Sequence, residues 1–282
     1  MLLGFNMLLW SDRITDEHFP LFAKLKQAGF DGVEIPIFGG APDNFKEIGR
    51  VARDNGLRVT AVTIMPDEAH DCTSSDEKAR AGGLEHLKWT IDSLAAAGGE
   101  VLCGPFYQPL GVFSGEPPTR TERANVVGVH KDAAAYAARH NIKLSVEPLN
   151  RFECYVLNTV ADAAEVVRQI GAPNYGILYD TFHANIEEKD PVGVIAPNVR
   201  YINHVHFSEN DRGTPGKGHV PWAATMKALK GSGYDAWCVI EAFGSALPGL
   251  VAATKVWRDL SRSPEEVYQF GGKFLREQWA SA

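Results

Sequence analysis

The chain has 282 residues, and its 28 Lys and Arg against 35 Asp and Glu give a formal net charge of −7. Hydrophobic residues make up 45% and charged residues 22%, which excludes a disordered chain, a coiled coil and a collagen-like fibre. The acidic balance argues against nucleic acid or an anionic membrane as a partner. No apolar run approaches the ~20 residues of a membrane helix. The apolar N-terminus also lacks the basic start and cleavage site of a signal peptide.

The four cysteines are far apart in the sequence and form no CxxC pair. They are Cys72, Cys103, Cys154 and Cys238. This spacing is not that of a disulfide framework, so we expect free thiols in a reducing compartment. The sequence therefore predicts a cytoplasmic protein.

Short apolar runs alternate with stretches of helical spacing along the whole chain. Eight runs read as buried strands: Leu2–Asn6, Gly32–Pro36, Arg58–Thr63, Val101–Gly104, Ile142–Glu147, Gly176–Asp180, Tyr201–His206 and Trp237–Glu241. Seven stretches read as helices: Asp16–Ala28, Asn44–Asp54, Ser75–Ala97, Ala124–Arg139, Val160–Ile170, Trp222–Gly231 and Pro264–Trp279. Several of these helices end at a glycine just before the next strand.

The repeated strand–helix unit predicts the α/β class and a single (β/α)8 TIM barrel over residues 1–282. The alternative is a doubly wound sheet. That fold usually carries a glycine-rich phosphate turn after its first strand. Here the first strand continues into FNMLLWSDR, with no GxGxxG motif, which favours the barrel.

Four consecutive predicted strands end in a side chain that can bind a metal: Glu147, Asp180, His206 and Glu241. In a TIM barrel these strand ends form the active-site mouth. Placing the four residues inward leaves apolar neighbours outward, as a surrounding layer of helices requires. One acidic residue at a strand end could cap the next helix, but four in succession are hard to assign to capping.

Three converging carboxylates would repel one another and raise their pKa values, and a divalent cation would relieve that repulsion. Three oxygen donors and one imidazole suit Mn²⁺ first, then Co²⁺ or Mg²⁺, better than a structural zinc site. The alternative is a hydrogen-bonded polar layer that closes the barrel. No Lys or Arg ends these four strands to balance the charge, so we expect one bound divalent metal.

Four segments carry a specific resemblance: SVEPLNRFECYVLNT, YDTFHANIEE, HVHFSENDRGTPGKGHVPW and VIEAFG. Over essentially its whole length the chain resembles the ketose 3-epimerases that act on D-tagatose, D-psicose (D-allulose) or L-ribulose, within the xylose-isomerase-like superfamily. The resemblance implies metal ligands at the four strand ends and substrate contacts at Glu153, His183 and Arg212. It also implies a homodimer or homotetramer.

The substrate-contacting set has alternative interpretations. Arg212 could form a loop salt bridge with Glu209 or Asp211, and His183 could cap a helix. Glu34 could orient other groups through hydrogen bonds or have a minor role in the site, and His204 lies one layer below His206 as a supporting or core histidine. Rings near the strand ends could stack on a sugar: Trp10, Phe106, Tyr107 and Phe243.

The two glutamates suggest the reaction. Removing the C3 proton of a ketose gives a cis-enediolate, and inversion at C3 requires an acid or base on each face. Glu147 and Glu241 end strands three apart in the ring, so they can flank one sugar as the catalytic pair while the metal stabilises the developing oxyanion. Because no phosphate-binding signature follows the eighth strand, we expect a free ketose.

Three other functions are compatible with parts of this pattern. An aldose–ketose isomerase of the same superfamily would use the same metal. An endonuclease-IV-like phosphodiesterase would need more histidines and a basic surface, which the net charge of −7 disfavours. A barrel that only binds a sugar would have no need of two flanking bases.

Overall fold

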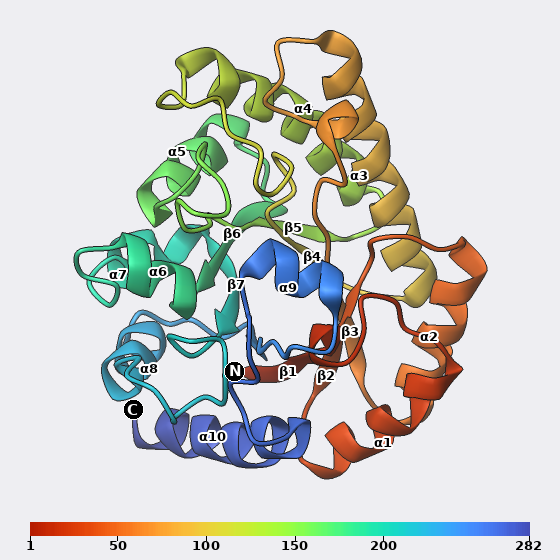
Figure 1. Cartoon of the computed structure of the whole chain (residues 1–282), viewed down its shortest axis with the longest axis vertical. Helices are drawn as coiled ribbons and strands as arrows, with labels where there is room; N and C mark the ends of the chain where they lie inside the picture. The colour runs from red at the N-terminus through yellow and green to blue at the C-terminus, as the bar shows by residue number, and fades with distance from the viewer.

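The structure is a computed structural model that describes residues 1–282. It shows eight parallel strands that close into one barrel in chain order, with β1 paired to β8 (Figure 1). The strands are β1 (Leu2–Asn6), β2 (Gly32–Pro36), β3 (Arg58–Val62), β4 (Val101–Gly104), β5 (Lys143–Val146), β6 (Tyr175–Asp180), β7 (Ile202–Phe207) and β8 (Trp237–Ile240). The predicted TIM barrel is therefore confirmed, and each strand boundary lies within a residue of its prediction.

Helices surround the barrel in an outer ring (Figure 1). They are α1 (Phe19–Gln27), α2 (Pro42–Asp54), α3 (Glu77–Ala97), α4 (Arg120–Ala138), α5 (Val160–Ile170), α6 (Thr181–Glu187), α7 (Ile195–Asn198), α8 (Trp222–Gly231) and α10 (Gly272–Ser281), whereas α9 (Pro248–Thr254) lies over the barrel mouth. Of these, α6, α7 and α9 lie outside the seven predicted stretches. The last predicted helix begins as a π-helical turn at Glu266–Gly271 before α10.

Local signals explain several boundaries. The Thr119 side chain accepts a hydrogen bond from the backbone N–H of Glu122, and Glu122 bonds back to Thr119, so a capping box starts α4 four residues before the predicted start. Gly98 ends α3 in the left-handed region with φ 70°. These caps satisfy backbone groups that the helix itself leaves unpaired.

The outward side chains of the strands form the main core with the helices. Leu144, Val146, Ile177 and Ile240 are fully buried in this layer, as their alternation with the strand-end residues predicts. Helices α2 and α3 approach so closely at Gly49 that a Cβ there would lie 2.1 Å from the carbonyl oxygen of Ala97. Only glycine fits at this contact.

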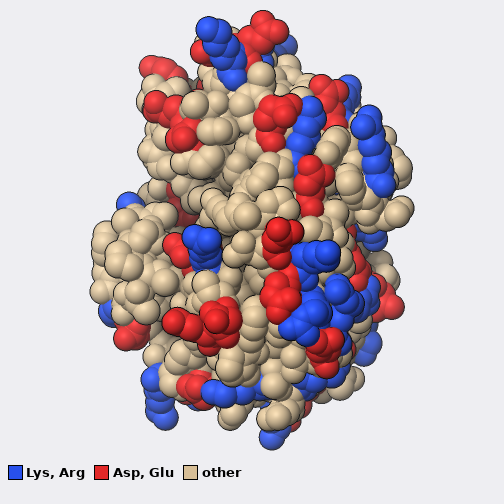
Figure 2. Space-filling model, turned by 90° about the vertical axis from the view of Figure 1, so that its right-hand side faces the viewer, with Lys and Arg blue, Asp and Glu red and all other residues tan.

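The carboxyl ends of all eight strands open at one mouth of the barrel, and α9 lies over that mouth (Figure 1). On the surface formed by the side of the barrel that carries α1 to α3, Lys and Arg side chains are interspersed with Asp and Glu (Figure 2). Arg50, for example, bonds both Glu47 and Asp54. None of the helices combines the length and the apolar character that crossing a bilayer would require.

Candidate active site

A cavity of about 290 Å³ lies at the carboxyl ends of the strands, beneath α9. Most of its polar side chains gather on the side of β5 to β8, namely Glu147, Glu153, His183, Arg212 and Glu241, and the others are Asp12 and Thr254. The remaining wall is largely apolar and includes Leu8, Phe38, Val62, Ile64, Phe243 and Leu250. The cavity therefore has one chemically active side and one that offers few hydrogen bonds.

The four strand-end residues named from the sequence lie together at the base of this cavity. Ligand atoms of Asp180, His206 and Glu241 all lie within 4.8 Å of one another, and a second such group joins Asp180 to Glu147 and His183. His206 Nδ1 lies 3.2 Å from Glu241 Oε1 and 3.9 Å from Asp180 Oδ2. Asp180 therefore connects the two groups.

Three of the potential metal-ligand atoms in these two groups have no hydrogen-bond partner. Glu147 Oε1, Asp180 Oδ2 and His206 Nδ1 are buried and make no hydrogen bond. A buried polar atom without a partner costs about 1–3 kcal/mol, and more when it is charged. Three such atoms close together are suited to bind a divalent cation. Oxygen ligands with one imidazole favour Mn²⁺, Co²⁺ or Mg²⁺.

The shifted pKa values of the carboxyl groups also favour a bound cation. Burial, reinforced by the nearby Glu241 carboxylate, raises the pKa of Asp180 to about 7. The same two causes raise the pKa of Glu147 well above its usual range. In the protein alone these groups thus hold protons at pH values where ordinary carboxyls are ionised, and a cation would favour their ionised forms.

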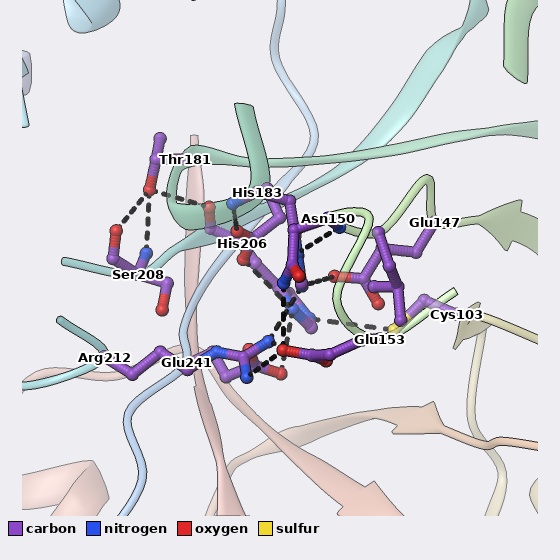
Figure 3. Close-up of polar contacts among 12 residues, drawn as sticks. Cys103, Glu147, Asn150, Glu153, Thr181, His183, His206, Ser208, Arg212 and Glu241 are labelled. Atoms are coloured by element: carbon purple, nitrogen blue, oxygen red, sulfur yellow. Dashed lines mark hydrogen bonds and ion pairs between the residues drawn. The ribbon is translucent and has the colours of Figure 1, made fainter. Parts of the chain in front are cut away.

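Arg212, Glu153 and His183 form one network beside Glu241 (Figure 3). Arg212 Nη1 donates to Glu153 Oε1 at 2.9 Å, and both side chains are buried. The guanidinium lies between two rings, 4.2 Å from the centre of Phe182 and 4.8 Å from that of Phe243. The alternative salt bridges from Arg212 to Glu209 or Asp211 do not form.

The His183 ring contacts the loop after β5. Its Nδ1 accepts a hydrogen bond from the backbone N–H of Asn150 at 2.9 Å, which assigns the proton of a neutral ring to Nε2. Burial, with nearby Arg212 and His206, lowers the pKa of His183 well below its usual value, so the ring is neutral. Nε2 lies 2.8 Å from Arg212 Nη2 and 3.7 Å from Glu147 Oε1. The side chains of Arg212 and His183 thus lie in direct contact at the wall of the cavity.

The loop after β7 holds Arg212 in a rare backbone conformation. Arg212 has φ 63°, which is uncommon for a residue other than glycine. Its N–H donates to the carbonyl of Glu209 at 2.8 Å, and its own carbonyl accepts from Phe243 at 2.9 Å. The buried Glu209 carboxylate accepts four further bonds, from the backbone N–H of Asn210, Gly216 and Val220 and from Trp222 Nε1. Glu209 therefore organises the loop and does not pair with the guanidinium.

Other expectations had mixed outcomes. Glu34 and His204 are buried below the cavity and do not line it, and His204 Nε2 lies 2.8 Å from Glu34 Oε2. Of the four candidate stacking rings only Phe243 reaches the cavity. The other three make ordinary packing contacts: Trp10 with Phe5 and Tyr268, Phe106 with His130, and Tyr107 with Cys154. All four cysteines are buried and unpaired.

Sequence reasoning missed three contributors to the site. Asn150, which donates to His183 and to Glu153 Oε1, stands only three residues after Glu147, and that position was a usable signal. Phe182 stacks on Arg212 from α6. The helix α9 supplies Leu250 and Ala253 to the cavity wall, and the sequence around it gave no clear helical pattern.

Known proteins show the same architecture. The family model of xylose isomerase-like TIM barrels matches residues 22–278. A probable ketose 3-epimerase of Synechocystis is 32% identical, covering 98% of this chain and 96% of its own. The ketose 3-epimerase of Arthrobacter globiformis is also 32% identical, with 99% and 96% covered. The chain therefore belongs to the xylose isomerase-like TIM barrels, and within them to the ketose 3-epimerases.

A solved structure supports the same grouping. The D-allulose 3-epimerase from a Methylomonas species, in complex with D-allulose, superimposes with a TM-score of 0.92 at 30% identity. The match covers 99% of this chain and 97% of that one.

Proposed function

We propose that this chain is a metal-dependent epimerase that inverts C3 of free ketoses such as D-tagatose, D-fructose, D-psicose or L-ribulose. The observation that carries the proposal is the set of three unpartnered donor atoms, on Glu147, Asp180 and His206, facing Glu241 at the base of the cavity. In this proposal those four residues hold one divalent cation, Mn²⁺ in first place. When bound, the cation polarises the substrate carbonyl and stabilises negative charge on the adjacent oxygen.

Glu147 and Glu241 are the proposed acid and base. They follow β5 and β8, on different sides of the barrel mouth, and both line the cavity. One carboxylate removes the C3 proton from its face of the ketose, which leaves a cis-enediolate. The other carboxyl returns a proton to the opposite face, and the roles exchange in the reverse direction.

Arg212, His183 and Glu153 are proposed to hold the O1–O3 end of the sugar. Arg212 and His183 lie side by side at the wall of the cavity, where each can donate a hydrogen bond to an oxygen of the substrate. Glu153 keeps Arg212 in place through the 2.9 Å ion pair. The position of the reacting carbon relative to the two glutamates then depends on this network.

The test is an incubation of the metal-loaded protein with D-tagatose, D-fructose or L-ribulose in D₂O, followed by NMR of the products. We expect the C3 epimer with deuterium at C3 and none at C1. An aldose product, or hydrogen moved between C1 and C2 without solvent label, would instead identify an aldose–ketose isomerase. A C3 epimer without solvent label would contradict the assigned roles of Glu147 and Glu241.

Three further assignments belong to this proposal. We propose that residues 1–282 act as one catalytic domain in the cytoplasm, which the four unpaired, buried cysteines support. We also propose a homodimer or homotetramer. Two exposed rings, Phe113 (45% exposed) and Phe152 (68%), support an interface near the barrel mouth. Light scattering on the purified protein distinguishes these states from a monomer.

A further inference from the structure

A second cluster of polar side chains lies one layer below the proposed metal ligands, closed off from the cavity. At its centre is Glu34 on β2, whose carboxylate is fully buried. Its Oε1 is contacted by His206 Nε2 at 2.6 Å and by Asn6 Nδ2 at 3.0 Å. Its Oε2 is contacted by His204 Nε2 at 2.8 Å, Thr60 Oγ1 at 3.0 Å and Cys103 Sγ at 3.2 Å. Five groups thus converge on one carboxylate.

The geometry assigns the proton on His206. A carboxylate only accepts, so the 2.6 Å contact places a hydrogen on His206 Nε2. If the ring is neutral, Nδ1 then carries a lone pair. That atom is buried, has no hydrogen-bond partner and lies 3.2 Å from Glu241 Oε1. The contact to Glu34 therefore sets both the tautomer of the ring and the direction in which its lone pair points.

Glu34 also reaches a second member of the site. Asn6, at the end of β1, donates through Nδ2 to Glu34 at 3.0 Å and lies 3.4 Å from Glu241 Oε1. Asn6 itself is fixed, because its Oδ1 accepts the backbone N–H of Leu8 at 2.9 Å. One buried carboxylate thus bonds His206 directly and reaches Glu241 through Asn6.

We infer that Glu34 is the positioning residue of the proposed metal site, holding His206 so that it binds the cation through Nδ1 while Nε2 keeps its proton. The inference rests on the metal site of the proposed function. Outer partners of this kind fix the orientation of a metal-binding histidine, and their loss typically lowers metal affinity by about 10–100-fold. Glu34 itself lies outside the cavity and touches no substrate.

The same cluster could instead be a second metal site, because the ligand atoms of Glu34, Cys103, His204 and His206 lie within 4.8 Å of one another. The hydrogen bonds favour the positioning role. The atoms of His204 and His206 that face Glu34 are the Nε2 atoms, which carry protons when they bond to a carboxylate. A second cation would have to displace both protons.

The first test needs no substitution. In the Co²⁺-loaded protein, proton NMR should show one strongly shifted, solvent-exchangeable resonance from the Nε2 proton of the metal-bound histidine. Metal titration should give one equivalent per chain. Absence of that resonance, or two tightly bound equivalents, would overturn the inference. If the wild-type protein bound no divalent cation, the proposed function itself would fail.

The second test compares two substitutions around the same carboxylate. In Glu34→Gln the carboxamide cannot accept from both histidines, so we expect the Kd for Mn²⁺ to rise by about 10–100-fold and the shifted resonance to be lost. Thr60→Val removes one hydrogen bond from an uncharged donor to Glu34 Oε2 and leaves both histidine contacts in place, so we expect less than about a threefold change in the Kd for Mn²⁺. Equal Kd values for Glu34→Gln and the parent would contradict the inference, whatever the activity. Glu34→Asp supplies the comparison if Glu34→Gln does not fold.

Discussion

Arg212 and Glu153 form a buried ion pair that joins the loop after β7 to the loop after β5. Arg212 Nη1 lies 2.9 Å from Glu153 Oε1, although the two residues are 59 positions apart in the chain. Truncation of either partner leaves a buried charge unpaired, which is the costly way to break such a pair. The pair therefore holds two loops of the cavity in one arrangement.

Replacing Arg212 should damage catalysis more than metal binding. For Arg212→Ala we expect a loss of about 1.5–3 kcal/mol in transition-state binding, read as a lower kcat/KM, because a charged hydrogen-bond donor is removed. The metal stoichiometry should stay at the parent value. The matched control is Arg151→Ala, which breaks a pair outside the cavity whose guanidinium is largely exposed, while Glu187 keeps the hydrogen bond from the backbone N–H of residue 151. Equal kinetics for Arg212→Ala and its control would remove Arg212 from the site.

Removing the metal, or one of its ligands, should abolish activity while leaving the barrel folded. Asp180 Oδ1 accepts the backbone N–H of His183 at 2.8 Å and caps α6, and an asparagine can make that same cap. We expect Asp180→Asn to keep the parent thermal unfolding curve of the metal-free protein. Its affinity for Mn²⁺ should fall by at least about 100-fold, more than the loss of an outer partner causes. Titration calorimetry measures both proteins, and parent-like binding by Asp180→Asn would count against the site.

Phosphorylated ketoses should be poor substrates. The only cationic side chain among the residues that line the cavity is Arg212, which is already paired with Glu153, and the far wall is largely apolar. A phosphate dianion placed against that wall would lose hydration without gaining a partner. In parallel assays we expect D-fructose to be turned over with a kcat/KM at least about tenfold above that of D-fructose 6-phosphate, a cost of about 1.4 kcal/mol or more. The reverse order would show that a phosphate site had been overlooked.

Buried His130 should make the protein less stable in mild acid. Burial lowers the pKa of His130 to about 4, although its Nε2 contacts the Phe106 carbonyl at 3.1 Å. As pH falls from about 6.5, the unfolded chain takes up a proton that the folded protein does not accept until about pH 4. Stability is therefore lost across that window, by about 3 kcal/mol in total from this one group. Urea unfolding between pH 7 and pH 4.5 measures the slope.

The control for this effect is His130→Gln, which cannot ionise. The variant should be less stable than the parent at pH 7, since the contact between His130 Nδ1 and Tyr175 Oη, at 2.6 Å, is disturbed. Its stability should nevertheless fall less steeply as the pH is lowered. If both proteins lost stability with the same slope, other groups would be responsible.

Much of the barrel follows from local sequence. Each strand is a short buried run, and four of these runs lead directly into a polar side chain, so the positions of Glu147, Asp180, His206 and Glu241 at one mouth could be predicted. The helix α9 could not, because its seven residues are mostly small and none is fully buried. Its position depends on the barrel mouth that it covers.

Which charged side chains pair with one another could not be predicted from the sequence. Glu209 and Asp211 are the carboxylates nearest to Arg212 in the chain, yet the partner is Glu153 on another loop. The Glu209 carboxylate accepts hydrogen bonds from N–H groups of its own loop, and these bonds cannot be predicted from the order of residues in the chain. Similarly, the role of Glu34 depends on contacts with residues that lie up to 172 positions away.

The pairing of β1 with β8 has a consequence for biosynthesis. Asn6 contacts Glu241 across 235 positions, so the first strand emerges from the ribosome long before the residues that complete its surroundings. During translation β1 has one edge without its neighbouring strand, and Glu147 and Asp180 are made well before Glu241, the last member of the proposed metal site. If these residues bind one cation as proposed, the complete site can form only after Glu241 has been made.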